Sequence, residues 1–276
     1  MAMPNHLVLV RHGESEANKA HKADRGGDPS LFTDEFRERH DSDMRLTSNG
    51  VEQAQAAGAW MMSDPVLSSG EYTRCYYSPH RRTVETAGNL GLDPDSGWLE
   101  NDLIRERDWG EFGASSEQEK MEVMSNSVAQ KEQNALYWCP TGGESLATGV
   151  RTRFERFLGT LHRDMAEQKV LMITHGEYID VARFVLERLT VPQWLEMNDD
   201  RAQKIQNCMI LHYTRENPST GELAKKLTWM RAICPWDKSL SHNEGEWQTL
   251  SVDIGERAVN DKQLLYRAEE MPRLFE

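Results

Sequence analysis

Short apolar runs alternate with longer amphipathic or polar segments along this chain, and the alternation predicts strands separated by helices. Residues 7–10 are apolar at every position. Such a run is typical of a strand that is buried on both faces of a parallel sheet. The other expected strands are short as well, and they cover residues 74–77, 99–104, 170–174, 208–214 and 223–231.

The segments between these runs carry helix start signals or apolar side chains at helical spacing. Ser48 or Asn49 is the expected cap of the first helix. Residues 11–45 are an exception, because they are polar and contain turn signals at residues 26–29, so a long loop is expected there. Strands that alternate with helices predict a layered α/β fold with a mostly parallel sheet. The expected helices cover residues 49–62, 79–89, 115–137, 143–165 and 178–189.

The length of 276 residues fits one large domain that carries insertions. We place the insertions at about residues 19–45 and 115–137. A C-terminal extension is expected from about residue 235, where the alternation of strands and helices fades. Because this extension contains Trp236 and Trp247, we expect it to pack back onto the body of the protein.

The formal net charge of −13 argues against a nucleic-acid or anionic-membrane partner, because both need a basic face. It leaves room for a small anionic substrate in a locally basic pocket. No apolar run approaches the length of a membrane span, and the chain gives no signal of its oligomeric state. A cytoplasmic setting is expected, because the scattered cysteines suggest neither a zinc site nor a disulfide framework; they are Cys75, Cys139, Cys208 and Cys234.

An arginine and a histidine follow the first expected strand directly. Arg11 and His12 begin a run that continues through Gly13 to Asn18. Ligands of an open parallel sheet bind at the carboxyl ends of its strands. An imidazole placed there acts as a nucleophile on phosphorus when it is neutral, which a pKa of roughly 6.5 allows at neutral pH.

A second histidine follows the expected strand 170–174 in the same way. His175 and Gly176 stand at its carboxyl end, and a helix is expected immediately afterwards. If this strand and the first one are neighbours, His12 and His175 share one pocket. One imidazole then attacks while the other donates to phosphoryl oxygens, and the N-terminus of the helix favours an anion.

Further charged side chains follow two other expected strands. Arg81 and Arg82 come after residues 74–77, and a guanidinium binds two phosphoryl oxygens at once. Near Trp109, a carboxyl held protonated by apolar surroundings is suited to act as a general acid. The candidates for that carboxyl are Glu106, Asp108 and Glu111.

Taken in order, these segments resemble the histidine phosphatase superfamily, also called the phosphoglycerate mutase-like family. The family has an Arg-His-Gly triplet after its first strand and a second His-Gly after a later one. The similarity covers roughly residues 7–213, and it implies a three-layer α/β sandwich with a mostly parallel central sheet. Three landmarks lie between the two histidine motifs, namely LT-x-x-G-x-x-QA from Leu46, R-x-x-x-TA from Arg82 and GES from Gly143.

The resemblance implies a role for each matching residue. His12 is the expected phosphoryl acceptor, and Glu106 is expected to protonate the leaving oxygen and then to deprotonate the attacking water. The register with Thr86-Ala87 favours Arg82 over Arg81, and the spacing to Gly110 favours Glu106 among the carboxyls. Neither a metal nor a cofactor is expected. The residues expected to hold the phosphate or substrate are Arg11, Asn18, Arg82, His175 and Gly176.

Three functions fit these motifs. A phosphomonoester phosphatase that acts on a small phosphorylated molecule is the preferred one. Phosphoglycerate mutase is the alternative, but mutases of the family carry an arginine pair where residues 115–137 have only Lys120 and Lys131. They also usually carry Gly-Asn-Ser where this chain has Gly-Glu-Tyr at residues 176–178. A catalytically inactive phosphoester-binding module is the third and least favoured function.

Overall fold

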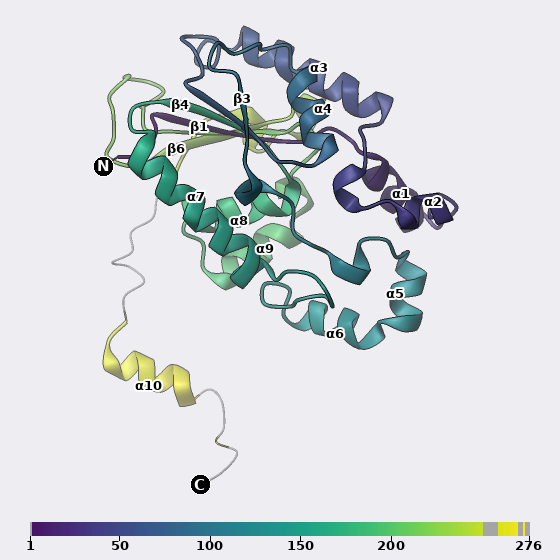
Figure 1. Cartoon of the computed structure of the whole chain (residues 1–276). Coiled ribbons are helices and arrows are strands. Elements are labelled where there is room, and N and C mark those ends of the chain that lie inside the picture. Colours follow the sequence, from purple (N-terminus) through teal and green to yellow (C-terminus); the bar gives the residue numbers. More distant parts are fainter. Residues whose placement is uncertain (1, 251–258, 270–272, 274–276) are drawn as a thin grey trace.

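A seven-stranded sheet in the order β3-β2-β4-β1-β5-β6-β7 forms the centre of the computed structural model, which describes residues 2–250, 259–269 and 273 (Figure 1). Strands β1 to β4 are parallel to one another, and β5 to β7 continue the sheet in antiparallel pairs. The predicted α/β fold with a parallel centre is therefore confirmed. The strands are β1 His6–Arg11, β2 Arg74–Tyr77, β3 Trp98–Glu100, β4 Lys169–Thr174, β5 Ile210–Thr214, β6 Trp229–Ile233 and β7 Gln248–Thr249.

Helices cover both faces of the sheet and complete three layers, as Figure 1 shows. Helices α3 (Ser48–Ser63) and α4 (Arg81–Asn89) lie on one face, and α7 (Arg151–Asp164) and α8 (Gly176–Leu186) lie on the other. Alternate residues of β1 enter the two cores: Val8 packs with the α3 side and Leu9 with the α7 side. Burial on both faces explains why this strand is apolar throughout.

Strands β1 and β4 are direct neighbours, and this pairing positions the site. Their parallel register runs from His6 opposite Lys169 to Arg11 opposite Thr174. The N–H of His12 continues the ladder by donating to the carbonyl of Thr174 at 2.9 Å. The two histidine motifs therefore leave the sheet side by side.

The prediction of a long loop over residues 11–45 is wrong, because about half of this segment is helical. Helix α1 (Glu16–Arg25) begins at Ser15, whose hydroxyl and backbone form a capping box with Asn18. Helix α2 (Asp34–Glu38) begins after Thr33, and a 3-10 turn, Asp41–Asp43, follows. Serine and threonine caps satisfy free N–H groups, and so they start helices even in polar segments.

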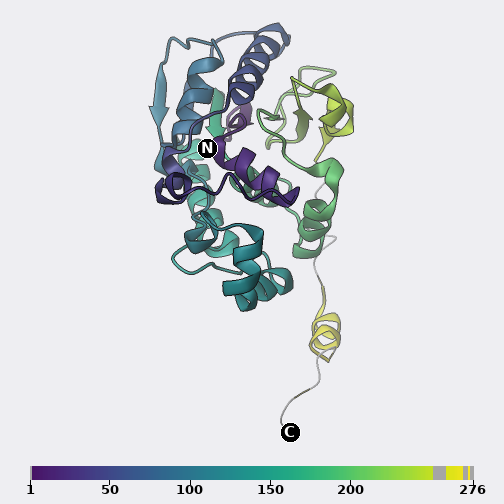
Figure 2. The ribbon, with the colours of Figure 1, turned by 90° about the vertical axis from the view of Figure 1, so that its right-hand side faces the viewer.

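Helices α5 (Glu117–Val123) and α6 (Ser125–Gln133) confirm the helical expectation for residues 115–137. Figures 1 and 2 show this pair beside α1 and α2. Asp24 accepts the N–H of Glu117 at 2.7 Å, and Arg37 forms an ion pair with Glu119 at 2.9 Å. The two segments that we identify as insertions therefore contact each other.

Several predicted boundaries are wrong by a few residues. Thr47, rather than Ser48 or Asn49, caps α3 by accepting the N–H of Gly50. The long helix expected from residue 143 starts with a π-helical turn, Leu146–Val150, before α7. The last predicted strand starts later, because Leu223 pairs only in an isolated bridge with Glu216. Local propensity sets element ends weakly, so capping and tertiary contacts decide them.

Part of the C-terminal extension packs on the body, as expected. The Trp247 ring lies 4.9 Å from the His212 ring, and Trp236 donates its indole N–H to the carbonyl of Asn207 at 2.7 Å. Residues 251–258 lie outside the described part of the chain, and after them the structure describes α10 (Asp261–Glu269). Among the described residues, every helix falls short of the length and apolarity needed to span a bilayer.

Candidate active site

The residues expected to carry the chemistry surround one cavity of about 930 Å³ at the carboxyl ends of β1 and β4. His175 is completely buried and does not line this cavity itself. Its imidazole ring nevertheless lies 5.2 Å from the ring of His12 between centroids. The expected residues that line the cavity are Arg11, His12, Asn18, Arg82, Glu106 and Gly176.

His12 is held in one orientation by a backbone contact. Its Nδ1 lies 2.7 Å from the carbonyl oxygen of Gly13, so Nδ1 carries the proton and donates it. This leaves Nε2 as the unprotonated nitrogen. Burial, and then the charges of Arg82 and Arg11, lower the pKa of His12 well below its usual value. The imidazole is therefore neutral at neutral pH.

His175 caps α8 from the end of β4 and contacts side chains from two other segments. Its Nε2 lies 2.8 Å from the hydroxyl of Ser78, and its Nδ1 lies 3.9 Å from Oε2 of Glu106. Nδ1 is buried without a hydrogen-bond partner. Burial, followed by Arg82, lowers the pKa of His175 well below its usual value. In the neutral tautomer that carries its proton on Nδ1, this nitrogen is a hydrogen-bond donor without a protein acceptor.

The two arginines approach the histidines from different elements. Arg11 ends β1, donates from Nη1 to the carbonyl of Ile205 at 2.7 Å, and has a buried Nε without a partner. A side chain at Gly176 would stand 3.3 Å from that Nε, so the glycine leaves room for the guanidinium. Arg82 is buried in the first turn of α4 and lines the cavity, whereas its neighbour Arg81 is exposed and does not.

Asp41 binds Arg82 at the point where the guanidinium faces the cavity. Arg82 donates from Nη2 to Oδ2 of Asp41 at 2.9 Å and from Nη1 to the Asp41 carbonyl at 2.6 Å. His80 lies 3.6 Å from the same carboxylate. Burial opposes ionisation of Asp41, but Arg82 and His80 outweigh it and hold the pKa of the carboxyl well below its usual range.

Glu106 is a carboxyl in a largely dehydrated position. Its Oε1 accepts the N–H of Arg107 at 2.9 Å. Burial, and after it the neighbouring Glu177, raise the pKa of Glu106 to about 7. The other two carboxyls considered for the acid, Asp108 and Glu111, are exposed and do not line the cavity. Glu106 is therefore the one of the three that is placed to exchange a proton with a bound molecule.

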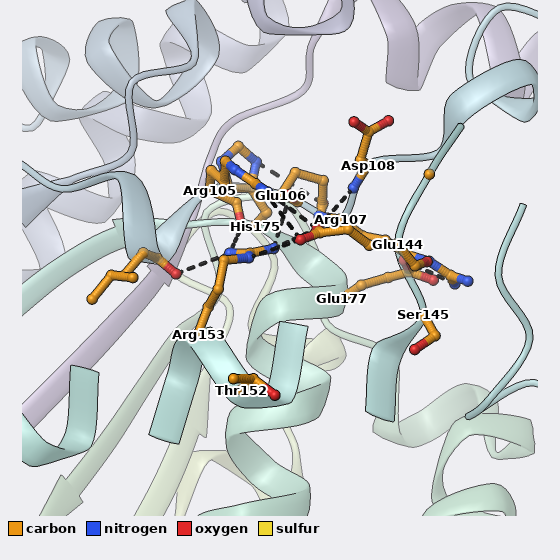
Figure 3. Close-up of polar contacts among 12 residues, drawn as sticks. Arg105, Glu106, Arg107, Asp108, Glu144, Ser145, Thr152, Arg153, His175 and Glu177 are labelled. Carbon is orange, nitrogen blue, oxygen red and sulfur yellow. Dashed lines mark hydrogen bonds and ion pairs between the residues drawn. The ribbon is translucent and has the colours of Figure 1, made fainter. Parts of the chain in front are cut away.

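A network of guanidinium groups holds the segment that carries Glu106 (Figure 3). Arg153 of α7 donates to the carbonyls of Leu103 and Arg105 at 2.9 Å and to the carbonyl of Glu106 at 3.2 Å. Glu144 binds the guanidiniums of both Arg153 and Arg105. Residues 143–145, the GES landmark, thus stabilise the segment that carries Glu106 through Arg153 and Arg105, and they do not line the cavity.

Asn18 lines the cavity, but its amide also has structural partners. Its Oδ1 accepts the Ser15 N–H at 3.3 Å and the side-chain N–H of Asn207 at 2.9 Å. Asn207 in turn donates to the carbonyl of His12 at 3.0 Å. Asn18 therefore links the start of α1 to the connector between α9 (Val191–Asp199) and β5.

Sequence reasoning missed several residues that the fold brings to this cavity. Asp41 belongs to no recognisable motif, and its position depends on how the segment after α2 folds back onto α4. Asp180 lies one turn into α8, and burial raises its pKa to about 7. Its spacing of four residues from Gly176 is the signal that would have placed it on the cavity side of this helix.

One group of side chains approaches the geometry of a metal site. His21, Asp24 and Glu117 offer ligand atoms within 4.8 Å of one another beside the cavity. The ammonium of Lys120 lies 2.8 Å from Oε1 of Glu117, and Asp24 already accepts the Glu117 N–H. One of the three side chains is therefore already paired with a cation, and we assign no metal to these residues.

Comparison with known proteins places this chain among relatives of one family. A 2,3-bisphosphoglycerate-dependent phosphoglycerate mutase from Parvibaculum lavamentivorans is 30% identical over 199 residues, which cover 71% of this chain and 86% of the relative. The phosphoglycerate mutase-like protein AT74 of Arabidopsis thaliana is 27% identical over 274 residues, covering 89% of this chain and 79% of the relative.

Among solved structures, a mycobacterial glucosyl-3-phosphoglycerate phosphatase in complex with VO3 shares the fold. Its TM-score is 0.56 at 21% identity, over 76% of this chain and 90% of that one. A profile of the histidine phosphatase superfamily (branch 1) matches residues 7–220, which include both histidine motifs, Arg82 and Glu106. Because this match spans most of the sequence, the chain belongs to the histidine phosphatase superfamily, branch 1.

Proposed function

We propose that this protein is a phosphomonoester phosphatase that transfers the phosphoryl group to His12 and then to water. The observation that carries the proposal is the proximity of two neutral imidazoles, 5.2 Å apart after adjacent parallel strands, to Arg11 at the end of β1 and to Arg82 in the first turn of α4. Phosphoryl transfer depends mainly on positioning and on charge stabilisation. These four side chains supply both.

His12 is the nucleophile of this proposal. Its Nδ1–H is bound to the Gly13 carbonyl, so the lone pair of Nε2 is free to attack phosphorus. The lowered pKa keeps this lone pair available at acidic as well as neutral pH. In the first step the Nε2–P bond forms and the bond from phosphorus to the leaving oxygen breaks. In the second step water replaces His12 on phosphorus.

The phosphoryl oxygens are bound by Arg11, Arg82 and His175. When Ser78 donates its hydroxyl proton to Nε2 of His175, the buried Nδ1 carries a proton and becomes a donor to an oxygen. Gly176 starts α8, and the free N–H groups of its first turn favour the same anion. Donors fixed in place before the reaction stabilise charge in the transition state most effectively.

Glu106 is the general acid and base. With a pKa of about 7, both its protonated and its ionised form are populated at neutral pH; the protonated form gives its proton to the leaving oxygen, and the carboxylate then takes one from the attacking water. The hydrogen bond from the N–H of Arg107 orients the carboxyl. We propose further that residues 19–45 and 115–137 select the substrate, because His21 from the first and Lys131 from the second line the cavity.

Phosphoglycerate mutase is the second candidate, because a relative of that name is 30% identical. In a mutase we expect an arginine pair on the cavity wall, but residues 115–137 contain no arginine. Lys120 pairs with Glu117, and Lys131 lies 4.8 Å above the Trp109 ring. These contacts favour the phosphatase over the mutase. Separately, we propose that the protein is located in the cytoplasm.

Release of p-nitrophenol from p-nitrophenyl phosphate tests the proposal, with and without EDTA. We expect turnover that persists in EDTA and is lost in His12→Ala. Isomerisation of 3-phosphoglycerate, with and without 2,3-bisphosphoglycerate, tests the mutase. An absence of turnover on a panel of phosphomonoesters would instead indicate an inactive binding module.

A further inference from the structure

A group of cations lines the cavity beyond the phosphoryl pocket and belongs to none of the motifs discussed above. Lys22 and Arg25 come from the last turns of α1, and Arg201 and Lys204 come from the connector between α9 and β5. In the described part of the chain, none of these side chains forms a hydrogen bond or an ion pair. Two other cations of the cavity, by contrast, are paired with carboxylates: Asp41 binds Arg82, and Glu117 binds Lys120.

The position of these cations on α1 follows from helix geometry. Asn18, Lys22 and Arg25 stand at positions i, i+4 and i+7, which lie along one helix face. All of them line the cavity, whereas Lys19 does not. With a rise of about 1.5 Å per residue, Lys22 and Arg25 lie roughly 6 and 10 Å along the helix axis from Asn18. Charges therefore extend from the phosphoryl pocket over the length of a small metabolite.

The opposite segment is fixed directly to the phosphoryl pocket. Arg11 binds the carbonyl of Ile205, the residue after Lys204. Asn207 donates to the carbonyl of His12, and Trp236 donates to the carbonyl of Asn207. The backbone that carries Lys204 is thus held in a constant position relative to His12, although the lysine side chain itself is exposed.

Electrostatics shows that these cations lie close enough to repel one another. Desolvation, and then Arg25, Arg11, Lys22 and Arg201, lower the pKa of the Lys204 ammonium, and each of those neighbours is a cation. Asp199 and Asp200 also line this side, but Asp200 accepts the N–H of Ala202 as a helix cap. An anion placed among the cations relieves their repulsion.

We propose that Lys22, Arg25, Arg201 and Lys204 form a second anion-binding site, and that the substrates are small phosphomonoesters with a second anionic group, a carboxylate or a phosphate. This inference rests on the proposed phosphatase function. The phosphoryl group to be transferred binds at His12, and the second group binds the cations about one to two helical turns away along α1. The second site also explains how a chain with a net charge of −13 attracts a molecule that carries two anionic groups.

A comparison of three sugar phosphates of one size tests the second site. Glucose 6-phosphate lacks a second anion, 6-phosphogluconate adds a carboxylate, and glucose 1,6-bisphosphate adds a phosphate. With the full chain at low ionic strength, we expect kcat/KM to be about tenfold higher for at least one of the two substrates with a second anionic group than for glucose 6-phosphate. The substrate that shows the preference identifies the second group. Added salt reduces the preference, because exposed charges are screened over about 8 Å at physiological ionic strength.

Variants assign the preference to these cations. In the double variant Lys22→Gln and Lys204→Gln we expect the ratio of kcat/KM values to fall at least fivefold, whereas Lys19→Gln on the same helix keeps it. Equal use of the three sugars by the wild type, or an unchanged ratio in the double variant, overturns the second site. Turnover of p-nitrophenyl phosphate by the wild type separates the outcomes, since its absence instead refutes the phosphatase function.

Discussion

Oε2 of Glu106 lies 3.9 Å from Nδ1 of His175, so the proposed acid stands beside the proposed phosphoryl-binding imidazole. The pKa of Glu106 is raised to about 7, whereas the pKa of His175 is lowered well below its usual value. Near neutral pH the imidazole is therefore uncharged, and the protonated form of the carboxyl is populated alongside the ionised one. A protonated carboxyl and a neutral imidazole are the states that leaving-group protonation and phosphoryl binding require.

Removing the acid is expected to affect substrates according to their leaving groups. Glu106→Gln leaves the shape of the side chain but removes the transferable proton. We expect kcat/KM, which covers the steps up to the departure of the leaving group, to fall by about 10²–10⁴ for an alkyl phosphate, the usual worth of general acid catalysis. Because p-nitrophenolate leaves without a proton, kcat/KM for p-nitrophenyl phosphate should fall much less. Equal losses of kcat/KM on both substrates would show that Glu106 does not protonate the leaving group.

The activity of the wild type should decline above about pH 7. The pKa of Glu106 is about 7, so the protonated fraction decreases above that pH, and kcat/KM for an alkyl phosphate decreases with it. The negative charge of Glu177 is one cause of this high pKa. Glu177→Gln removes that repulsion, which favours ionised Glu106 and lowers its pKa.

We therefore expect the descending limb of the pH profile to move to lower pH in Glu177→Gln. Glu132→Gln provides the control, because Glu132 is exposed on α6 and does not line the cavity. The measurement is kcat/KM against pH for the wild type and both variants. A limb that stays in place in Glu177→Gln, or moves to higher pH, would contradict the electrostatic link between the two carboxyls.

The convergence of the histidines was predictable because it depends on strand order alone. Two short runs, each followed by His-Gly, predict parallel strands that end at one edge of the sheet, and the register of β1 and β4 confirms that they are neighbours. Burial of Cys75 and Cys208 was predictable in the same way, from their apolar surroundings, and both are fully buried.

The partners of Arg82 were not predictable, because they depend on the path of a polar segment. Asp41 contacts Arg82 because residues 16–43, which form α1, α2 and a 3-10 turn, fold back over α4. Hydrophobic periodicity carries little information about such a path, because few of its side chains enter the core. The raised pKa of Glu106 was expected from Trp109, but the larger causes are burial as a whole and the charge of Glu177.

Asp41 is expected to compete with the phosphoryl group for Arg82. Its carboxylate accepts a hydrogen bond from Nη2 of Arg82 and adds a negative charge to the wall of the cavity. Asp41→Asn removes the charge and retains the backbone carbonyl that Nη1 binds. We expect the inhibition constant of orthovanadate to fall by about threefold to tenfold, since a change of about 1.4 kcal/mol is a factor of ten.

Asp43→Asn is the matched control for this measurement. Asp43 lies two residues away and approaches the exposed Arg81 at 3.7 Å, outside the cavity. Its substitution should leave vanadate inhibition unchanged. Weaker inhibition of Asp41→Asn than of the wild type would mean that Asp41 orients Arg82 and does not compete for it.

Arg153 is expected to stabilise the fold and to position Glu106 at the same time. Its side chain is buried, it donates to the carbonyls of Leu103, Arg105 and Glu106, and it pairs with Glu144 at 2.8 Å (Figure 3). Arg153→Met leaves these acceptors without a donor and Glu144 without one of its two guanidiniums. Breaking a buried ion pair from one side costs about 3–5 kcal/mol, and we expect a loss of that size in the free energy of unfolding measured in urea.

Arg156→Met, at an exposed position of the same helix, should change the free energy of unfolding by less than about 0.5 kcal/mol. The kinetic consequence separates positioning from stability. Because Arg153 holds the segment that carries Glu106, kcat/KM of Arg153→Met should fall more for an alkyl phosphate than for p-nitrophenyl phosphate under conditions in which the variant is folded. If kcat/KM is unchanged for both substrates, Arg153 contributes to stability alone, and Glu106 keeps its position without it.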